Sequence, residues 1–148
     1  MQGNSTLVSL KEIVPVREWE EFLQHGKDYL RTGTAAYAQH RKAFTPEVLY
    51  NLTAMAIEKF VMAAVFRQGD LPYNHTMSDL VEAMDRALPG RIDEIRQDLL
   101  NLDRYQEICD LDAFSIQPPN MDEIPAMLAL AKRLQDLVTE EVVTPGRA

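Results

Sequence analysis

Hydrophobic positions are most concentrated between residues 45 and 68, in the segment TPEVLYNLTAMAIEKFVMAAVFRQ. On a helical wheel its apolar side chains point in most directions and leave no broad polar face, which is typical of a helix with neighbours on most sides. Thr45 can accept a free N–H group of the first turn, and Pro46 suits the first helical position. Gly69 and Pro72 favour an end to the helix. We therefore predict one central buried helix over residues 45–68.

Hydrophobic stripes at helical spacing recur through the rest of the chain. They predict helices over residues 16–33, 76–88, 91–109 and 122–143, with 34–42 as a short helix or a continuation past a kink. We expect an all-α fold, an up-and-down helical bundle of four long helices plus one short helix, because no strand pair with a hairpin turn occurs. The bundle is expected to form a single domain over residues 16–143, preceded by an extended N-terminal arm, residues 1–15, that ends at Pro15.

The composition fits one soluble intracellular domain. With 148 residues and 46% hydrophobic content, the chain is long enough to bury one core without metal or disulfide links. Cys109 is its only cysteine, so no internal disulfide can form, which favours the cytosol. Glu58 and Lys59 interrupt the longest apolar run, and the N-terminus lacks the pattern of a secretory signal. We expect a cytoplasmic protein with no membrane-spanning segment.

The charge balance argues against bulk binding of nucleic acid. Fifteen Lys and Arg against 23 Asp and Glu give a net charge of −8, which does not suit a protein that neutralises many phosphates. A short basic cluster is interpreted as a solvated turn rather than a binding patch, and its members are Arg31, His40, Arg41 and Lys42.

Motifs for the common enzyme chemistries are absent from the sequence. There is no G-x-S-x-G nucleophile motif and no glycine-rich phosphate-binding loop. None of the histidines follows a glutamate at the Glu-x-x-His spacing of metal sites in helical bundles. Cys109 is interpreted as a structural or surface thiol. We expect no catalytic residue, no cofactor and no bound metal.

Polar residues in the central helix are the first candidates for ligand binding. Asn51 and Glu58 lie seven residues apart, so they share one side of the helix, with Lys59 close by. Such a line can form a polar slot between helices. Alternatively, Glu58 or Lys59 reaches solvent or an opposite charge on a neighbour.

A second pair of candidates, His75 and Asp79, lies at the start of the helix predicted over residues 76–88. Free N–H groups and the helix dipole attract anions at such a position. The alternative is that Thr76 and Asp79 only cap the helix, which leaves His75 as a loop residue without a ligand.

Several of these residues also belong to patterns of a known family. The patterns are the leading alanines of AAYAQHRKAF, small-x-x-x-Glu-Lys over residues 54–59, and His-x-x-x-Asp-Leu over residues 75–80. In these features the middle third of the chain resembles HEPN domains, a family of small helical domains named for nucleotide binding. The resemblance implies a helical bundle, commonly a homodimer, that often works with a small nucleotidyltransferase or in a toxin–antitoxin system.

The motif of the RNA-cutting HEPN members is not found. In those members four to six residues separate an Arg from a following His, whereas seven separate Arg67 from His75 and Arg17 from His25. We therefore expect a non-catalytic, homodimeric binding module for a nucleotide-like ligand or a partner protein. Its candidate residues are Asn51, Glu58, Lys59, His75 and Asp79. Two alternatives stay open: a metal-independent RNase of the same family, and a structural dimer or adaptor that uses the apolar residues of the arm.

Overall fold

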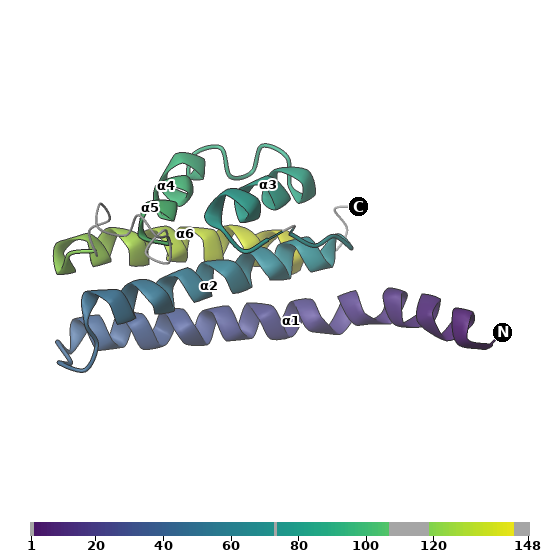
Figure 1. Cartoon of the computed structure of the whole chain (residues 1–148), viewed down its shortest axis with the longest axis horizontal. Coiled ribbons are helices and arrows are strands. Elements are labelled where there is room, and N and C mark those ends of the chain that lie inside the picture. Colours follow the sequence, from purple (N-terminus) through teal and green to yellow (C-terminus); the bar gives the residue numbers. More distant parts are fainter. Residues whose placement is uncertain (1, 73, 107–118, 144–148) are drawn as a thin grey trace.

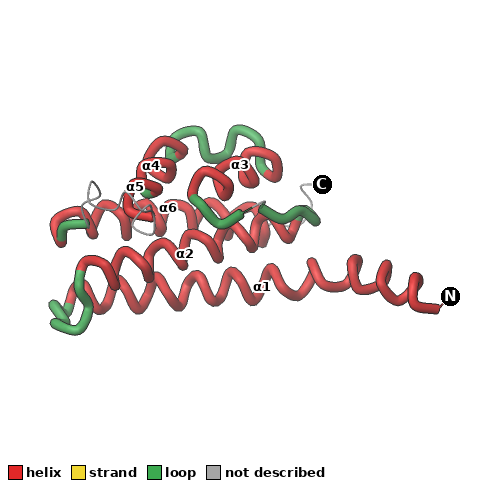
Figure 2. Tube along the Cα trace, in the orientation of Figure 1, coloured by secondary structure: helices red, strands yellow, loops and turns green. Residues whose placement is uncertain are grey.

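A computed structural model of the chain describes residues 2–72, 74–106 and 119–143. Every regular element among these residues is a helix (Figure 2), so the predicted all-α class is confirmed. The elements are α1 (Gln2–Ala38), α2 (Pro46–Arg67), α3 (Met77–Ala87), α4 (Arg96–Asn101), α5 (Asp103–Gln106), the short 3₁₀ helix η3 (Met121–Glu123) and α6 (Ile124–Val143).

Three long helices form the body of the structure. α2 packs against both α1 and α6, and α1 also contacts α6. Figure 1 shows that α1 runs opposite to α2, whereas α6 runs in the same direction as α2. The short helices α3, α4 and α5 lie on the side of α2 and α6 that faces away from α1. α2 therefore has neighbours on several sides.

The middle of α2 is the most deeply buried part of the core. Ala56, Ile57, Phe60 and Val65 have no exposed surface, and they pack in one cluster with residues of α1, α3, α4 and α6. Full burial of a large apolar side chain contributes roughly 1.5–3 kcal/mol. The prediction of a central buried helix is confirmed. Met55 is an exception at 39% exposed, because it borders the groove described below.

Both ends of α2 follow the signals in the sequence. The Val48 N–H donates to the Thr45 hydroxyl at 3.2 Å, and Pro46 is the first helical residue. Gly69 follows the end of the helix with a φ of 79°, a left-handed conformation that glycine adopts without strain. The start and end of this helix were therefore predicted correctly.

The connection after α2 runs back along that helix. His75, just before α3, contacts Glu58 in the middle of α2, whereas Arg86 near the end of α3 contacts Asp70 just after α2. α3 therefore runs in the same direction as α2. A fully extended stretch of eight residues, the number from 69 to 76, spans about 26 Å. The connection is therefore long enough to return the roughly 14 Å that separates Arg67 from Glu58 along α2. The predicted up-and-down order is not confirmed.

The single helix expected over residues 91–109 is broken in the structure. Residues 91–95 form turns, and α4 and α5 follow as two short pieces; residues 107–109, with Cys109, lie outside the described residues. The Ile95 N–H donates to the Ile92 carbonyl at 3.0 Å, a tighter turn than that of an α-helix. Between α4 and α5, the Leu102 carbonyl accepts a hydrogen bond from the Tyr50 hydroxyl at 3.1 Å. This tertiary contact competes with the regular hydrogen bonds of a longer helix.

α1 is longer than the sequence patterns indicated. It begins at Gln2 and continues to Ala38, so the extended conformation expected for the arm is wrong, and so is a helix end at Gly33. Of the two alternatives for residues 34–42, the continuation describes residues 34–38. Pro15 lies inside this helix, where its missing N–H removes one backbone hydrogen bond. Gly33 is buried, and an added Cβ there would lie 3.6 Å from Leu128 of α6, an ordinary contact distance. In Figure 1 the N-terminal part of α1 extends past the other helices.

By length and composition alone, α2 could cross a membrane, and it is the one such helix among the described residues. However, 61% of its apolar window is buried inside the protein. This burial is typical of the core helix of a folded domain.

Candidate functional site

A groove of about 770 Å³ lies between α2 and the start of α3. We call it the α2/α3 groove. It brings together three of the predicted site residues, Asn51, Glu58 and His75. Its other lining residues are Glu47, Tyr50, Ala54, Met55, Thr76, Met77, Leu80, Tyr105 and Pro119. From Glu47 to Glu58 it follows about 16 Å of α2.

The Glu58–His75 pair is the central polar contact of the α2/α3 groove. Nδ1 of His75 lies 2.7 Å from Oε1 of Glu58. The His75 side chain is 62% exposed and that of Glu58 only 29%, so the imidazole lies over a partly buried carboxylate. Because Nδ1 faces Glu58, Nε2 remains available to a ligand. The contact also holds the residues just before α3 against α2.

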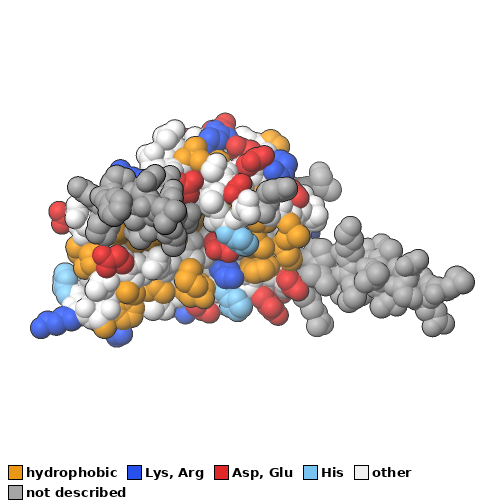
Figure 3. All heavy atoms as spheres, in the orientation of Figure 1, with side chains coloured by type: hydrophobic (Ala, Val, Ile, Leu, Met, Phe, Trp, Pro, Cys, Tyr) orange, Lys and Arg blue, Asp and Glu red, His pale blue; other side chains and the backbone are white. Residues whose placement is uncertain are grey.

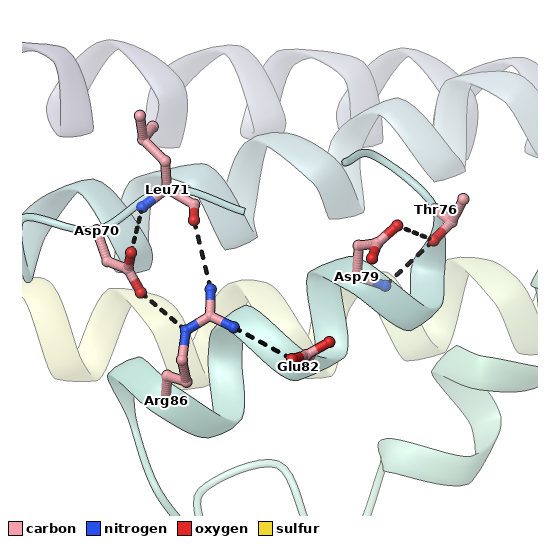
Figure 4. A network of polar contacts seen from close by, with 6 residues as sticks. All are labelled: Asp70, Leu71, Thr76, Asp79, Glu82 and Arg86. Carbon is pink, nitrogen blue, oxygen red and sulfur yellow. Dashed lines mark hydrogen bonds and ion pairs between the residues drawn. The ribbon is translucent and has the colours of Figure 1, made fainter. Parts of the chain in front are cut away.

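Two other predicted residues lie outside this groove. Nζ of Lys59 sits 5.2 Å from the centre of the Phe22 ring of α1, a cation–π contact. Asp79 is turned toward Thr76 at the start of α3 (Figure 4). The Asp79 N–H donates to the Thr76 hydroxyl at 3.1 Å, and that hydroxyl donates to the Asp79 carboxylate at 2.5 Å. The helix-capping alternative for Thr76 and Asp79 therefore describes their geometry.

Asp103 is a functional neighbour that sequence reasoning missed. Its carboxylate accepts hydrogen bonds from the N–H groups of Met77 at 2.7 Å and Ser78 at 3.1 Å. These are the N–H groups of α3 that would attract an anion. The protein's own carboxylate fills the position, so the start of α3 offers no free anion site. No local signal reveals this contact, because Asp103 comes from α5.

A polar cluster of Tyr105, Arg104 and Glu123 borders the far end of the groove. The Tyr105 hydroxyl and the Arg104 guanidinium both donate to the Glu123 carboxylate. Hydrogen bonds lower the pKa of Glu123. The largest effect comes from the Tyr105 hydroxyl and the next largest from the Asn120 N–H. Burial raises the pKa of Tyr105, and its hydrogen bond to Glu123 acts in the same direction. The cluster links α5 to η3, directly before α6, and fixes the position of the Tyr105 ring.

The α2/α3 groove has an acidic and apolar lining. Glu47 and Glu58 supply two carboxylates, and none of its described lining residues is Lys or Arg. In Figure 3 histidine side chains lie near the middle of the molecule among acidic, basic and hydrophobic side chains. Among the described residues, no group of three His, Cys, Asp or Glu side chains could hold a metal ion. The groove therefore suits a ligand with donor groups and apolar surface.

Comparisons with known proteins leave the function to be argued from this geometry. No family model matches the chain, and neither the curated proteins nor the solved structures include a match.

Proposed function

We propose that the chain is a non-catalytic binding module of the HEPN type, whose α2/α3 groove takes a segment of a partner protein that carries a basic side chain. The observation that carries this proposal is the lining of the groove, which offers two carboxylates and apolar surface without any described Lys or Arg. A Lys or Arg of the partner would meet Glu58 or Glu47, and its apolar neighbours would cover Met55.

A nucleotide-like ligand receives less support from the same observations. Phosphate is usually recognised by Arg, Lys or the free N–H groups at a helix start. The described lining holds no Arg or Lys, and Asp103 already binds the first N–H groups of α3. Glu47 and Glu58 would repel phosphate. These observations favour a polypeptide ligand over a nucleotide.

The identity of the partner rests on the family resemblance. It makes a small nucleotidyltransferase, or the other member of a toxin–antitoxin pair, the first partner to test. The same resemblance supports a homodimer, which light scattering at several protein concentrations would measure directly. A mass equal to that of the monomer at all concentrations would remove the homodimer from the proposal.

Selection from a displayed library of nonapeptides tests the proposed groove. We expect enrichment of peptides with Lys or Arg beside apolar residues. Their affinity should fall about tenfold in Glu58→Gln, the equivalent of roughly 1.4 kcal/mol. Glu20→Gln removes the same charge from an exposed position of α1 and should leave the affinity unchanged. Enrichment of acidic peptides, or equal affinity in both variants, would contradict the proposal.

A nucleotide panel followed by thermal melting tests the alternative ligand. A ligand that binds only the folded state raises the melting temperature. We expect no such rise with ATP, GTP or AMP at millimolar concentration, because the groove should not bind a nucleotide. A rise in melting temperature that the Glu58→Gln substitution changes would show that this groove binds a nucleotide instead of a peptide.

One observation favours an RNase as the second candidate. The contact between Glu58 and His75 orients an imidazole, as a carboxylate does for a general base. The acidic lining of the groove opposes the approach of RNA. We expect no cleavage of a single-stranded RNA by the purified protein. Cleavage that disappears in His75→Ala, with unchanged circular dichroism, would establish the enzyme instead.

A further inference from the structure

A second groove, of about 650 Å³, lies between α1 and α6. We call it the α1/α6 groove. No described residue of α2, α3, α4 or α5 lines it. Its floor is apolar and built from small or branched side chains, and its rim is basic. The lining residues are Lys27, Leu30, Arg31, Thr34, Ala35, Ala38, Leu128, Ala129, Lys132 and Gln135.

The charge of the α1/α6 groove is opposite to that of the whole chain. Lys27, Arg31 and Lys132 line it, and no carboxylate does so among the described residues. Arg31 and Lys132 are paired by Asp28 at 3.1 Å and Asp136 at 2.8 Å, both from outside the lining. Within the described part of the chain, the Lys27 ammonium has neither an ion-pair nor a cation–π partner. Because two of the three lining cations are paired with carboxylates, the rim keeps an excess of one positive charge, at Lys27, in a protein of net charge −8.

The shape of the α1/α6 groove suits a helix. Two long helices flank it, and they are in ordinary packing distance at Gly33, where an added Cβ would lie 3.6 Å from Leu128. Thr34, Ala35, Ala38 and Ala129 leave room for the side chains of a third helix. A helix that packs its side chains into such a groove lies with its axis about 8–10 Å from the axis of each neighbouring helix.

We propose that the α1/α6 groove is a docking site for an acidic amphipathic helix of a partner protein. The apolar face of that helix would cover Leu30 and Leu128. Its flanking Asp or Glu side chains would meet Lys27 and Lys132. A second copy of this chain suits the site less well, because a two-fold interface would bring each basic rim against itself. Nucleic acid suits it less well because the floor is apolar.

A labelled helical peptide tests this proposal. The probe has Leu at positions i, i+3 and i+7, with Glu at the flanking positions, and its binding is followed by fluorescence anisotropy. We expect saturable binding in the micromolar range. A peptide with Lys in place of every Glu should bind at least about tenfold more weakly. The absence of binding by the folded protein, or stronger binding of the Lys peptide, would overturn the proposal.

Two neighbouring cations of α6 provide a matched pair of variants. Lys132 lines the groove and Arg133 does not, yet both side chains are exposed, at 59% and 56%, and each pairs with one carboxylate. Lys132→Glu should weaken binding about tenfold, whereas Arg133→Glu should change it less than twofold. Equal effects of the two substitutions would show a general attraction of charge and would overturn the proposed site.

Two alanines of α6 test the apolar floor in the same way. Ala129→Trp should fill the groove and abolish binding, whereas Ala126→Trp, also exposed but outside the lining, should leave it unchanged. Circular dichroism and light scattering accompany both variants. If the wild type is a dimer that only Ala129→Trp separates, the occupant is a second copy. If a short single-stranded RNA displaces the peptide, the occupant is nucleic acid; each result would overturn the partner helix.

Discussion

Gly26 of α1 lies against the most buried ring of the core. A Cβ at this position would be 2.5 Å from Cε1 of Phe60 and 3.2 Å from the Ala56 carbonyl oxygen. Phe60 has no exposed surface, so its ring cannot move away without disturbing its neighbours. Gly26→Ala should therefore destabilise the protein by about 1–3 kcal/mol, despite the better helix propensity of alanine. Urea unfolding followed by circular dichroism measures the change.

Gly33 provides the control for this prediction, because it is the second buried glycine of the same helix. A Cβ there would meet Leu128 at 3.6 Å and Leu52 at 3.8 Å, which are ordinary contact distances. Gly33→Ala should stabilise the protein by up to about 1 kcal/mol. A loss of stability in both variants would contradict the close packing inferred at Gly26.

Asp103 supports a second residue-level prediction. Asp103→Ala removes the hydrogen bonds to the N–H groups of Met77 and Ser78, so we expect a loss of about 1–2 kcal/mol in the free energy of unfolding. Asp103→Asn retains an acceptor and should lose less. Asp98→Ala, an exposed position in α4, should change stability by less than about 0.5 kcal/mol. Equal effects at Asp98 and Asp103 would contradict a specific cap.

These residues also show what local sequence can predict about the site. Thr45 and Thr76 act on N–H groups three residues ahead, so their capping role was visible in the sequence. The capping role of Asp103 depends on a contact across the fold and was not visible. The contact between Glu58 and His75 also joins residues from different segments. The sequence placed them on neighbouring segments but could not show that they touch.

At the scale of elements, the loop after α2 determines where His75 lies. Asp70 and Arg86 fasten its first residues to the end of α3 (Figure 4). Asp70 accepts hydrogen bonds from the Leu71 N–H and from the Arg86 guanidinium, and both lower the pKa of its carboxyl group. The effect of the Leu71 N–H is the larger of the two. A lowered pKa in the folded state means that the charged carboxylate stabilises the fold above the ordinary pKa of about 4. That contribution is lost as the pH falls through the folded-state pKa.

Asp70→Asn should therefore reduce stability at pH 7, and its difference from the wild type should shrink as the pH falls below about 4. Urea unfolding at pH 7, 4 and 2.5 measures this difference. Asp98→Asn serves as the exposed control and should show no such trend. A constant difference across the three pH values would show that the charge of Asp70 does not hold the loop.

Long helices with a clear hydrophobic stripe were predictable from the sequence. The breaks between helices were harder to predict. Residues 45–68 have a start signal, an apolar interior and an end signal that agree, and α2 follows them. In residues 91–109 the stripe alone indicated one helix, but the hydrogen bond from Tyr50 to Leu102 and the turns after Gly90 divide it. Gly33 gave an end signal, yet α1 continues through it to Ala38. Local signals decided the bounds of α2, whereas a tertiary contact decided the break within residues 91–109.

At the scale of the whole molecule, charge is separated in a way that the net value hides. The α2/α3 groove carries Glu47 and Glu58, whereas the α1/α6 groove carries Lys27, Arg31 and Lys132. The net charge of −8 argues against bulk phosphate binding but says nothing about either surface. The two grooves share no described lining residue, so each can be tested by its own substitutions.

The projecting part of α1 gives the last prediction. In Figure 1 this part of the helix extends beyond α2 and α6, so its backbone has no neighbouring helix there. A helix without tertiary packing contributes little to stability in water. Deletion of residues 1–16 should lower the melting temperature by less than about 2 °C, the equivalent of under about 1 kcal/mol for a protein of this size. Circular dichroism measures both the melting and the expected loss of helical signal. A much larger fall in melting temperature, together with a smaller mass by light scattering, would show that this segment holds two chains together.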